Sequence, residues 1–290
     1  MSSTGEIMNR FCFWGFIAVG LVLSPKPVLA QDTLPFKDAI RNFAESREGT
    51  ENYELSLTIN ERGRPSRATN GVVNPAVDEP VVTLEIAADQ TANRRLVAEY
   101  QLQDGANQLQ RLHVRTPQFS IHVQNAKGSI SHPSNRRMDG HFDPLAFGIA
   151  PLGDMHRGSS LHEIAEYYME WPSLESRVMA DKTVRYGEDD GRSSYLLFLD
   201  PERGYSPVRL RDRTGNKGTF NVSLKLISKK GFWLPLSAVV EEPERTRTLQ
   251  FDWRSINSDI DDRFDPQKIE SKYGLNLRDN RLPATITESE

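Results

Sequence analysis

Several histidines and carboxylates come close to metal-binding patterns without completing one. Residues His162 to Glu166 (HEIAE) have the length of a zinc-protease motif. That motif needs a second histidine at its fifth position, so that both imidazoles hold the metal from one helical face. Glu166 stands there instead. A solvated helix face, with Glu163 as a capping residue, is therefore the favoured interpretation.

Two further stretches could bind a cation. A central loop could bring together four ligands, namely His141, Asp143, Asp154 and His156. Histidines scattered along a loop are more often polar surface than metal ligands. The acid-rich stretch 259–265 has Phe264 where an EF-hand needs its glycine. We therefore expect no bound metal.

Enzymatic and nucleic-acid functions find little support. The sequence contains neither Gly-x-Ser-x-Gly nor Gly-x-Gly-x-x-Gly, and the glycine pair Gly148 and Gly153 is followed by an acid instead of a phosphate-binding lysine. With 40 acidic and 36 basic residues the net charge is −4, which argues against nucleic-acid binding. A single cysteine excludes a disulfide framework. We expect a binding protein with no catalytic residue and no cofactor, and keep an enzyme as a minor alternative.

The first 30 residues have the pattern of a secretory signal peptide. Phe11 to Leu23 is an uncharged run of 13 residues, whereas a membrane span needs about 20. Val28 and Ala30 fit positions −3 and −1 of a cleavage site after Ala30. We expect an exported protein, periplasmic or secreted, that does not span the membrane after cleavage. A retained anchor is the alternative.

The mature chain reads as one α+β domain over residues 31–280, followed by a polar tail at 281–290. A helix is predicted over 35–47, and a second one from Leu161 to Glu170 with a Ser160/Glu163 capping box. Between and after them, apolar and polar residues alternate in about eleven strands, which predicts an antiparallel sheet that is covered on one side only. The strands are expected at 53–59, 82–88, 96–102, 111–115, 119–123, 178–186, 195–199, 208–210, 222–226, 236–240 and 249–253.

Two helices cannot fill the apolar face of so large a sheet if the sheet is strongly curved. The remaining space would form a groove suited to an acyl chain. An ordinary filled core is the alternative, because both have the same periodicity, and a register slip of one residue would invert the lining. The predicted lining comprises Leu57, Leu84, Leu96, Phe119, Leu224, Leu236 and Phe251 on the strands, with Ile164, Tyr168 and Trp171 on the helical lid.

Four features together resemble the LolA/LolB-like superfamily of periplasmic lipoprotein carriers. They are an exported N-terminal helix that leads into an antiparallel meander, Leu197 to Pro207 (LFLDPERGYSP), Gly231 to Pro235 (GFWLP) and the closing segment Phe264 to Asp279. The resemblance implies an open, curved half-barrel whose concave face is covered by helices and holds the acyl chains of a lipid or lipoprotein. The alternative on the same fold is an envelope protein-interaction or stress-sensor domain. A central insert at about 128–172 departs from a minimal carrier.

Overall fold

The computed structural model describes residues 33–63, 66–67, 73–74, 81–133, 143–149, 159–189, 194–213 and 218–281. These residues belong to one compact unit, Thr33–Glu290. The expected signal peptide, and all but the first residue of the expected tail, lie outside the described residues.

Three α-helices are present among the described residues: α1 (Phe36–Glu48), α2 (Leu161–Met169) and α3 (Pro266–Tyr273). The two predicted helices are confirmed almost to the residue, and α2 begins with the expected capping box, in which the Ser160 amide donates to Glu163 at 2.8 Å. Helix α3 was not predicted. It has only eight residues, between an Asp265 N-cap and a left-handed Gly274, so no apolar stripe marks it. Short 3₁₀ turns are η1 (Pro144–Ala146), η3 (Pro201–Arg203) and η5 (Asp261–Phe264).

Sixteen strands accompany these helices. In chain order they are β1 (Asn52–Gly63), β2 (Ser66–Arg67), β3 (Val73–Asn74), β4 (Val82–Asp89), β5 (Arg94–Gln103), β6 (Ala106–Arg115), β7 (Ser120–Gln124), β8 (Lys127–Ser131), β9 (Ser176–Val178), β10 (Val184–Tyr186), β11 (Ser194–Asp200), β12 (Ser206–Arg213), β13 (Thr219–Lys229), β14 (Phe232–Glu241), β15 (Arg245–Ile256) and β16 (Leu277–Asp279).

Fourteen of the strands form one open sheet in the order β16-β8-β7-β6-β5-β4-β1-β15-β14-β13-β12-β11-β10-β9, while β2 and β3 pair separately. Neighbours are antiparallel except for β16, which runs parallel to β8. The α+β class with an open, mostly antiparallel sheet is confirmed, but the predicted number of strands was too low. The stretch 178–186 contains the end of β9 and all of β10, separated by a turn with positive φ at Lys182. Strands β8 and β16 are too short and too polar to show a clear alternation.

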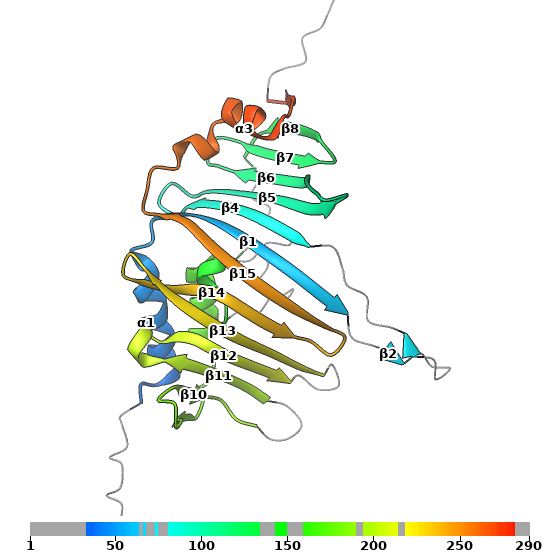
Figure 1. Cartoon of the computed structure of the whole chain (residues 1–290). Coiled ribbons are helices and arrows are strands. Elements are labelled where there is room, and N and C mark those ends of the chain that lie inside the picture. Colours follow the sequence, from blue (N-terminus) through cyan, green and yellow to red (C-terminus); the bar gives the residue numbers. More distant parts are fainter. Residues whose placement is uncertain are drawn as a thin grey trace, which may run out of the picture. The chain divides into compact units, whose positions relative to one another are not determined.

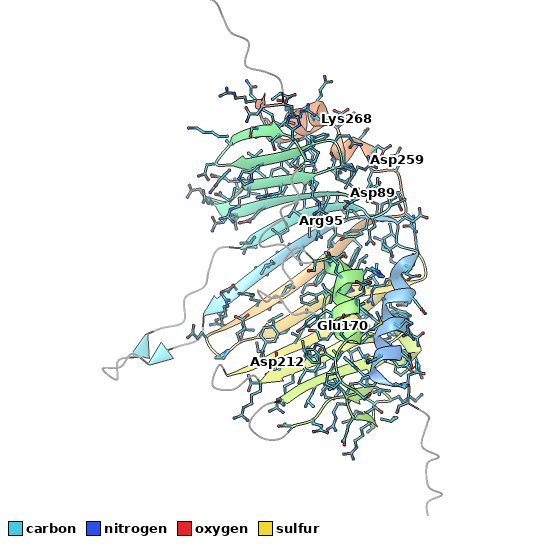
Figure 2. The ribbon with its side chains drawn as sticks, turned by 180° about the vertical axis from the view of Figure 1, so that it is seen from behind. Asp89, Arg95, Glu170, Asp212, Asp259 and Lys268 are labelled. Atoms are coloured by element: carbon cyan, nitrogen blue, oxygen red, sulfur yellow. The ribbon has the colours of Figure 1, made fainter. Side chains whose placement is uncertain are left out.

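The sheet carries two apolar layers on opposite faces. Face A is the face on which α1 and α2 pack, over β1, β4 and β10–β15. Face B is the opposite face, where η5 and α3 pack over β4–β8 and β16. Figure 1 shows α3 beside β7 and β8 at one end of the sheet, and Figure 2, drawn from behind, shows α1 and α2 over the other end.

The apolar layer passes from face A to face B of the sheet at β4 and β5. Ile86 on β4 pairs with Val97 on β5, and both lie in the face A layer, whereas the adjacent pair Ala87 and Leu96 lies in the face B layer. The prediction of a sheet covered on one side by helices on a single concave face was therefore wrong. Alternation shows that neighbouring residues point to opposite faces, but not which face is covered. No helix among these residues is long and apolar enough to cross a membrane.

Candidate ligand-binding site

Seven of the ten predicted lining residues lie together on face A. Phe251, Leu57 and Leu84 form one cross-strand row on β15, β1 and β4. Beside this row, the face A layer also contains Leu224 on β13 and the residues of the predicted lid, Ile164, Tyr168 and Trp171. These seven residues therefore belong to the same apolar layer.

The other three predicted residues lie elsewhere. Leu96 and Phe119 are buried in the face B layer. Leu236 is 40% exposed, because β14 bulges at this point: Ser237 pairs with Lys225 and Pro235 with Leu226, so Leu236 is skipped. Placing Leu236 in the same lining as Ala238 was wrong for this reason.

The space beneath α2 is filled by the protein's own central segment, residues 143–149. Leu145, Phe147 and Ile149 are each no more than 1% exposed. The Phe147 ring lies against that of Phe251, with the ring centroids 5.3 Å apart. Among the described residues, the segment 143–149 therefore occupies part of the face predicted to be a groove.

One carboxylate holds this segment in place. Asp143 Oδ1 accepts hydrogen bonds from the Leu145 amide at 3.0 Å and the Tyr53 hydroxyl at 3.2 Å, and Oδ2 accepts from the Leu161 amide at 3.0 Å. Burial, together with the nearby Asp143 carboxylate, raises the pKa of Tyr53 well above its usual value. Asp143 therefore joins β1, η1 and the first turn of α2.

The metal hypotheses gain no support from the described part of the chain. Asp143 is occupied by three donors, while His141, Asp154 and His156 lie outside the described residues. His162 and Glu166 form an exposed pair on α2, with Nε2 and Oε1 3.2 Å apart. The described residues contain no group of three or more side chains placed to hold a metal ion.

A cavity of about 250 Å³ lies on face B, beneath α3. Its apolar part includes Leu96 on β5 and Ile269 on α3, each only 2% exposed. Lys268 and Asp262 form the outer edge of the cavity, and their side chains are largely exposed to solvent. Arg263, Lys272 and Tyr273 complete the lining. Leu96 is thus the predicted groove residue that lines this open space.

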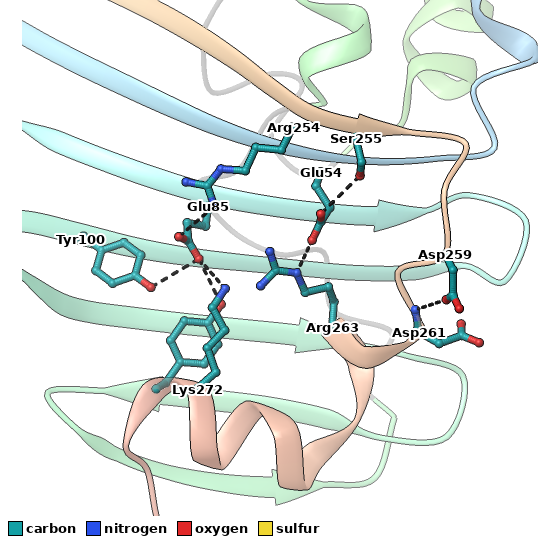
Figure 3. Close-up of polar contacts among 10 residues, drawn as sticks. Glu54, Glu85, Tyr100, Arg254, Ser255, Asp259, Asp261, Arg263 and Lys272 are labelled. Atoms are coloured by element: carbon teal, nitrogen blue, oxygen red, sulfur yellow. Dashed lines mark hydrogen bonds and ion pairs between the residues drawn. The ribbon is translucent and has the colours of Figure 1, made fainter. Parts of the chain in front are cut away.

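Glu85 organises the charges beside the cavity (Figure 3). Its Oε2 accepts from Lys272 Nζ at 2.8 Å, and its Oε1 accepts from Arg254 at 3.2 Å. The hydroxyls of Tyr100 and Tyr273 lie 3.5 Å from Oε2. Burial alone would raise the pKa of the Glu85 carboxyl, but the two cations outweigh it and hold that pKa below its usual value. The carboxylate stays ionised and ties α3 to β4 and β15.

Glu54 provides a second anchor on the same face. It accepts hydrogen bonds from the Arg263 Nε and from the Ser255 hydroxyl, the latter at 3.3 Å. In Figure 3 the two terminal nitrogens of Arg263 point away from Glu54, toward Lys272. Among the described residues these two nitrogens have no hydrogen-bond acceptor.

This site was not predicted from the sequence. Glu54 and Glu85 stand at the polar positions of strands in which apolar and polar residues alternate. Such positions are normally interpreted as solvent-exposed. The segment that covers them was not recognised as a helix. The pattern from Asp265-Pro266 to Gly274, an N-cap with proline at N1 and a glycine at the C-cap, could have revealed it.

Comparisons with known proteins return structural likenesses only. No protein-family model matches the chain, and no curated protein matches it. A LolA superfamily protein from Nitrosomonas europaea aligns over 81% of this chain and 99% of its own, at 10% identity and a TM-score of 0.47. A DUF1329 family protein from Desulfovibrio piger also aligns over 81% of this chain and 99% of its own, at 10% identity and a TM-score of 0.47. An uncharacterised conserved protein from Thermus thermophilus aligns over 84% of this chain and 98% of its own, at 10% identity and a TM-score of 0.28.

The superfamily that the sequence motifs resemble is thus among the solved structures to which the chain is similar. The chemistry of the site rests on its own residues.

Proposed function

We propose that the protein is an exported, non-enzymatic, carrier-like binder of lipid or lipoprotein acyl chains, and that the cavity beneath α3 holds the chain. The observation that carries this proposal is an open space of about 250 Å³ with buried apolar residues, Leu96 and Ile269, and a charged edge that reaches the solvent. Such a combination suits a ligand with an apolar chain and a polar head.

The dimensions favour part of a single chain over a whole lipid. An apolar cavity of about 150 Å³ already binds benzene, whereas sites for drug-sized ligands span about 300–1,000 Å³. Each buried CH₂ group contributes about 0.8 kcal/mol, and micromolar binding requires about 8 kcal/mol. Full burial of roughly ten carbons would therefore be needed for micromolar affinity, and the open edge of this cavity leaves part of such a chain in solvent, so we expect weaker binding.

The face A residues remain a predicted second lining. Phe251 lies against Phe147 of the segment 143–149, in the same apolar layer as Leu57 and Leu84. A chain could bind there only after this segment has moved away, and the energy of that displacement would reduce the apparent affinity. The cavity beneath α3 needs no such step.

Native mass spectrometry of the mature protein, gently purified after export and followed by lipid extraction, tests the proposal. We expect co-purifying acyl lipid, or uptake of added decanol. Ile269→Phe, which fills the cavity, should weaken uptake at least tenfold. Ile164→Phe is the matched control on α2 and should leave uptake unchanged.

Two results would overturn the proposal. A protein that carries no lipid and takes up no decanol would rule out the binding function. Loss of uptake in Ile164→Phe, with normal uptake in Ile269→Phe, would show that the acyl chain binds on face A instead. Circular dichroism of both variants controls for unfolding, because overpacking a core costs about 1–3 kcal/mol.

A further inference from the structure

The charges beside the cavity do not cancel. The cavity adjoins a smaller hollow that Glu54, Glu85 and Arg254 help to line. Together the two spaces are lined by four cations, Arg254, Arg263, Lys268 and Lys272, and by three carboxylates, Glu54, Glu85 and Asp262. Lys268 is balanced by Asp262 and, from outside the lining, by Asp259 and Asp265. One positive charge therefore remains among Arg254, Arg263, Lys272, Glu54 and Glu85 when all of these groups are ionised. Because the site is partly enclosed, this excess is screened less than it would be on an open surface.

The pairing of these groups shows where the excess lies. Glu85 forms ion pairs with two cations, Lys272 and Arg254. Lys268 contacts Asp262. Arg263 contacts Glu54 through Nε alone. Its two terminal nitrogens form the edge of the guanidinium that has no acceptor in the described part of the chain.

A guanidinium edge has two parallel N–H groups that match the two oxygens of a carboxylate. The Arg263 side chain is 25% exposed, so this edge is partly shielded from water. Arg263 also lines the same cavity as Leu96 and Ile269. An apolar chain and an anionic head can therefore be accommodated in one site.

We propose that the ligand of this cavity is a monoanionic single-chain amphiphile of the fatty-acid type, whose carboxylate is bound by the terminal nitrogens of Arg263 and whose chain lies against Leu96 and Ile269. The inference rests on the proposed function, since it names the head group of the chain that the cavity holds. A single negative charge neutralises the cluster. A dianionic head would meet the three carboxylates, and a cationic head would meet the excess of cations.

Three probes with the same ten-carbon chain separate the head group from the chain. Decanoate, decanol and decyltrimethylammonium are titrated into the full mature protein by isothermal titration calorimetry at pH 7 and low ionic strength. We expect decanoate to bind at least tenfold more tightly than decanol, and decyltrimethylammonium to bind most weakly. Arg263→Gln should reduce decanoate binding to the level of decanol in the same variant.

Arg209→Gln is the matched control, because it also removes one arginine from an ion pair, with Asp181, but on β12 and outside the lining of the cavity. We expect it to bind decanoate as tightly as the unmodified protein. Equal loss of decanoate binding in Arg209→Gln and Arg263→Gln would assign the effect to the overall charge or a disturbed fold and overturn the role of Arg263.

The remaining outcomes are distinguishable. Equal binding of decanoate and decanol overturns the anionic head group and leaves the proposed function intact. Binding of none of the three probes overturns the proposed function and this inference together. A preference for decanoate that survives Arg263→Gln places the head group elsewhere.

Discussion

The ring of Phe147 packs against that of Phe251, with centroids 5.3 Å apart and planes inclined by 54°. Phe251 lies on β15, in the cross-strand row with Leu57, and Phe147 directly follows η1. This contact decides the state of the predicted groove, because it places a side chain of the central segment where an acyl chain was expected. Among the described residues, the segment 143–149 therefore packs on part of the face A layer.

Phe147→Ala should destabilise the protein and create a cavity beneath α2. We expect the free energy of unfolding to fall by about 3–5 kcal/mol, as for other buried Phe→Ala changes. Phe198→Ala is the control: Phe198 is 7% exposed and lies under Arg209, outside both apolar layers, so the flexible Arg209 side chain can cover the gap and the loss should cost less. Denaturant unfolding of both variants measures the difference. Equal losses would show that Phe147 does not anchor the central segment.

Asp143→Ala should loosen α2, because it removes the acceptor of three hydrogen bonds. Two buried backbone amides and one hydroxyl lose their partner, and each unsatisfied group costs about 1–3 kcal/mol. Tyr53→Phe removes one donor and leaves both amides bonded, so it should cost only about 0.5–1.5 kcal/mol. Hydrogen exchange of the Leu161 amide reports the effect directly. Exchange that stays slow in Asp143→Ala would contradict this role.

Glu85 should make the protein sensitive to acid. Its pKa is lowered in the folded protein from the usual 4.5, so at acidic pH the unfolded chain binds more protons than the folded one. The stabilisation is fully present above about pH 4.5 and is lost as the pH falls through the lower folded-state pKa. Glu85→Gln should therefore flatten the decline of stability between about pH 5 and pH 2.

Glu244→Gln is the control for this titration. Glu244 is exposed between β14 and β15, and the described structure gives it no ion pair. Thermal unfolding across the pH range should follow that of the unmodified protein. If the thermal stability of Glu85→Gln fell with decreasing pH as steeply as that of Glu244→Gln, Glu85 would not contribute to acid stability.

Arg47→Met should be at least as stable as the unmodified protein. Arg47 is 1% exposed, and two of its three side-chain nitrogens, Nε and one terminal nitrogen, have no hydrogen-bond partner. Burial lowers its pKa to about 9, although the Asp143 charge partly opposes this. A buried charge with incomplete bonding costs more than an apolar side chain of similar length.

The methionine would lose the bonds that one terminal nitrogen of Arg47 donates to the Trp233 carbonyl at 2.7 Å and to the Ser206 hydroxyl at 3.4 Å. A clear fall in the denaturant midpoint of Arg47→Met would show that these bonds, together with the contact to the Phe43 ring, outweigh the cost of burial. Arg47→Lys, which keeps the charge but loses the planar group, should be less stable than Arg47→Met.

The sequence by itself determined the local structure of this protein. Helix α1, the Ser160/Glu163 capping box of α2 and the period-two strands depend on neighbouring residues, so their patterns could be read directly. The same patterns identified the row formed by Phe251, Leu57 and Leu84. They also indicated that the sheet is open and mostly antiparallel.

Only the tertiary structure decided which face each apolar strand buries and where space remains. Leu84 and Leu96 have equivalent patterns, yet one lies on face A and the other on face B, because the cover changes sides between β4 and β5. A bulge turns Leu236 outward, and the segment 143–149 packs on part of face A. These outcomes depend on contacts between residues far apart in the chain, and periodicity within a strand holds no information about them.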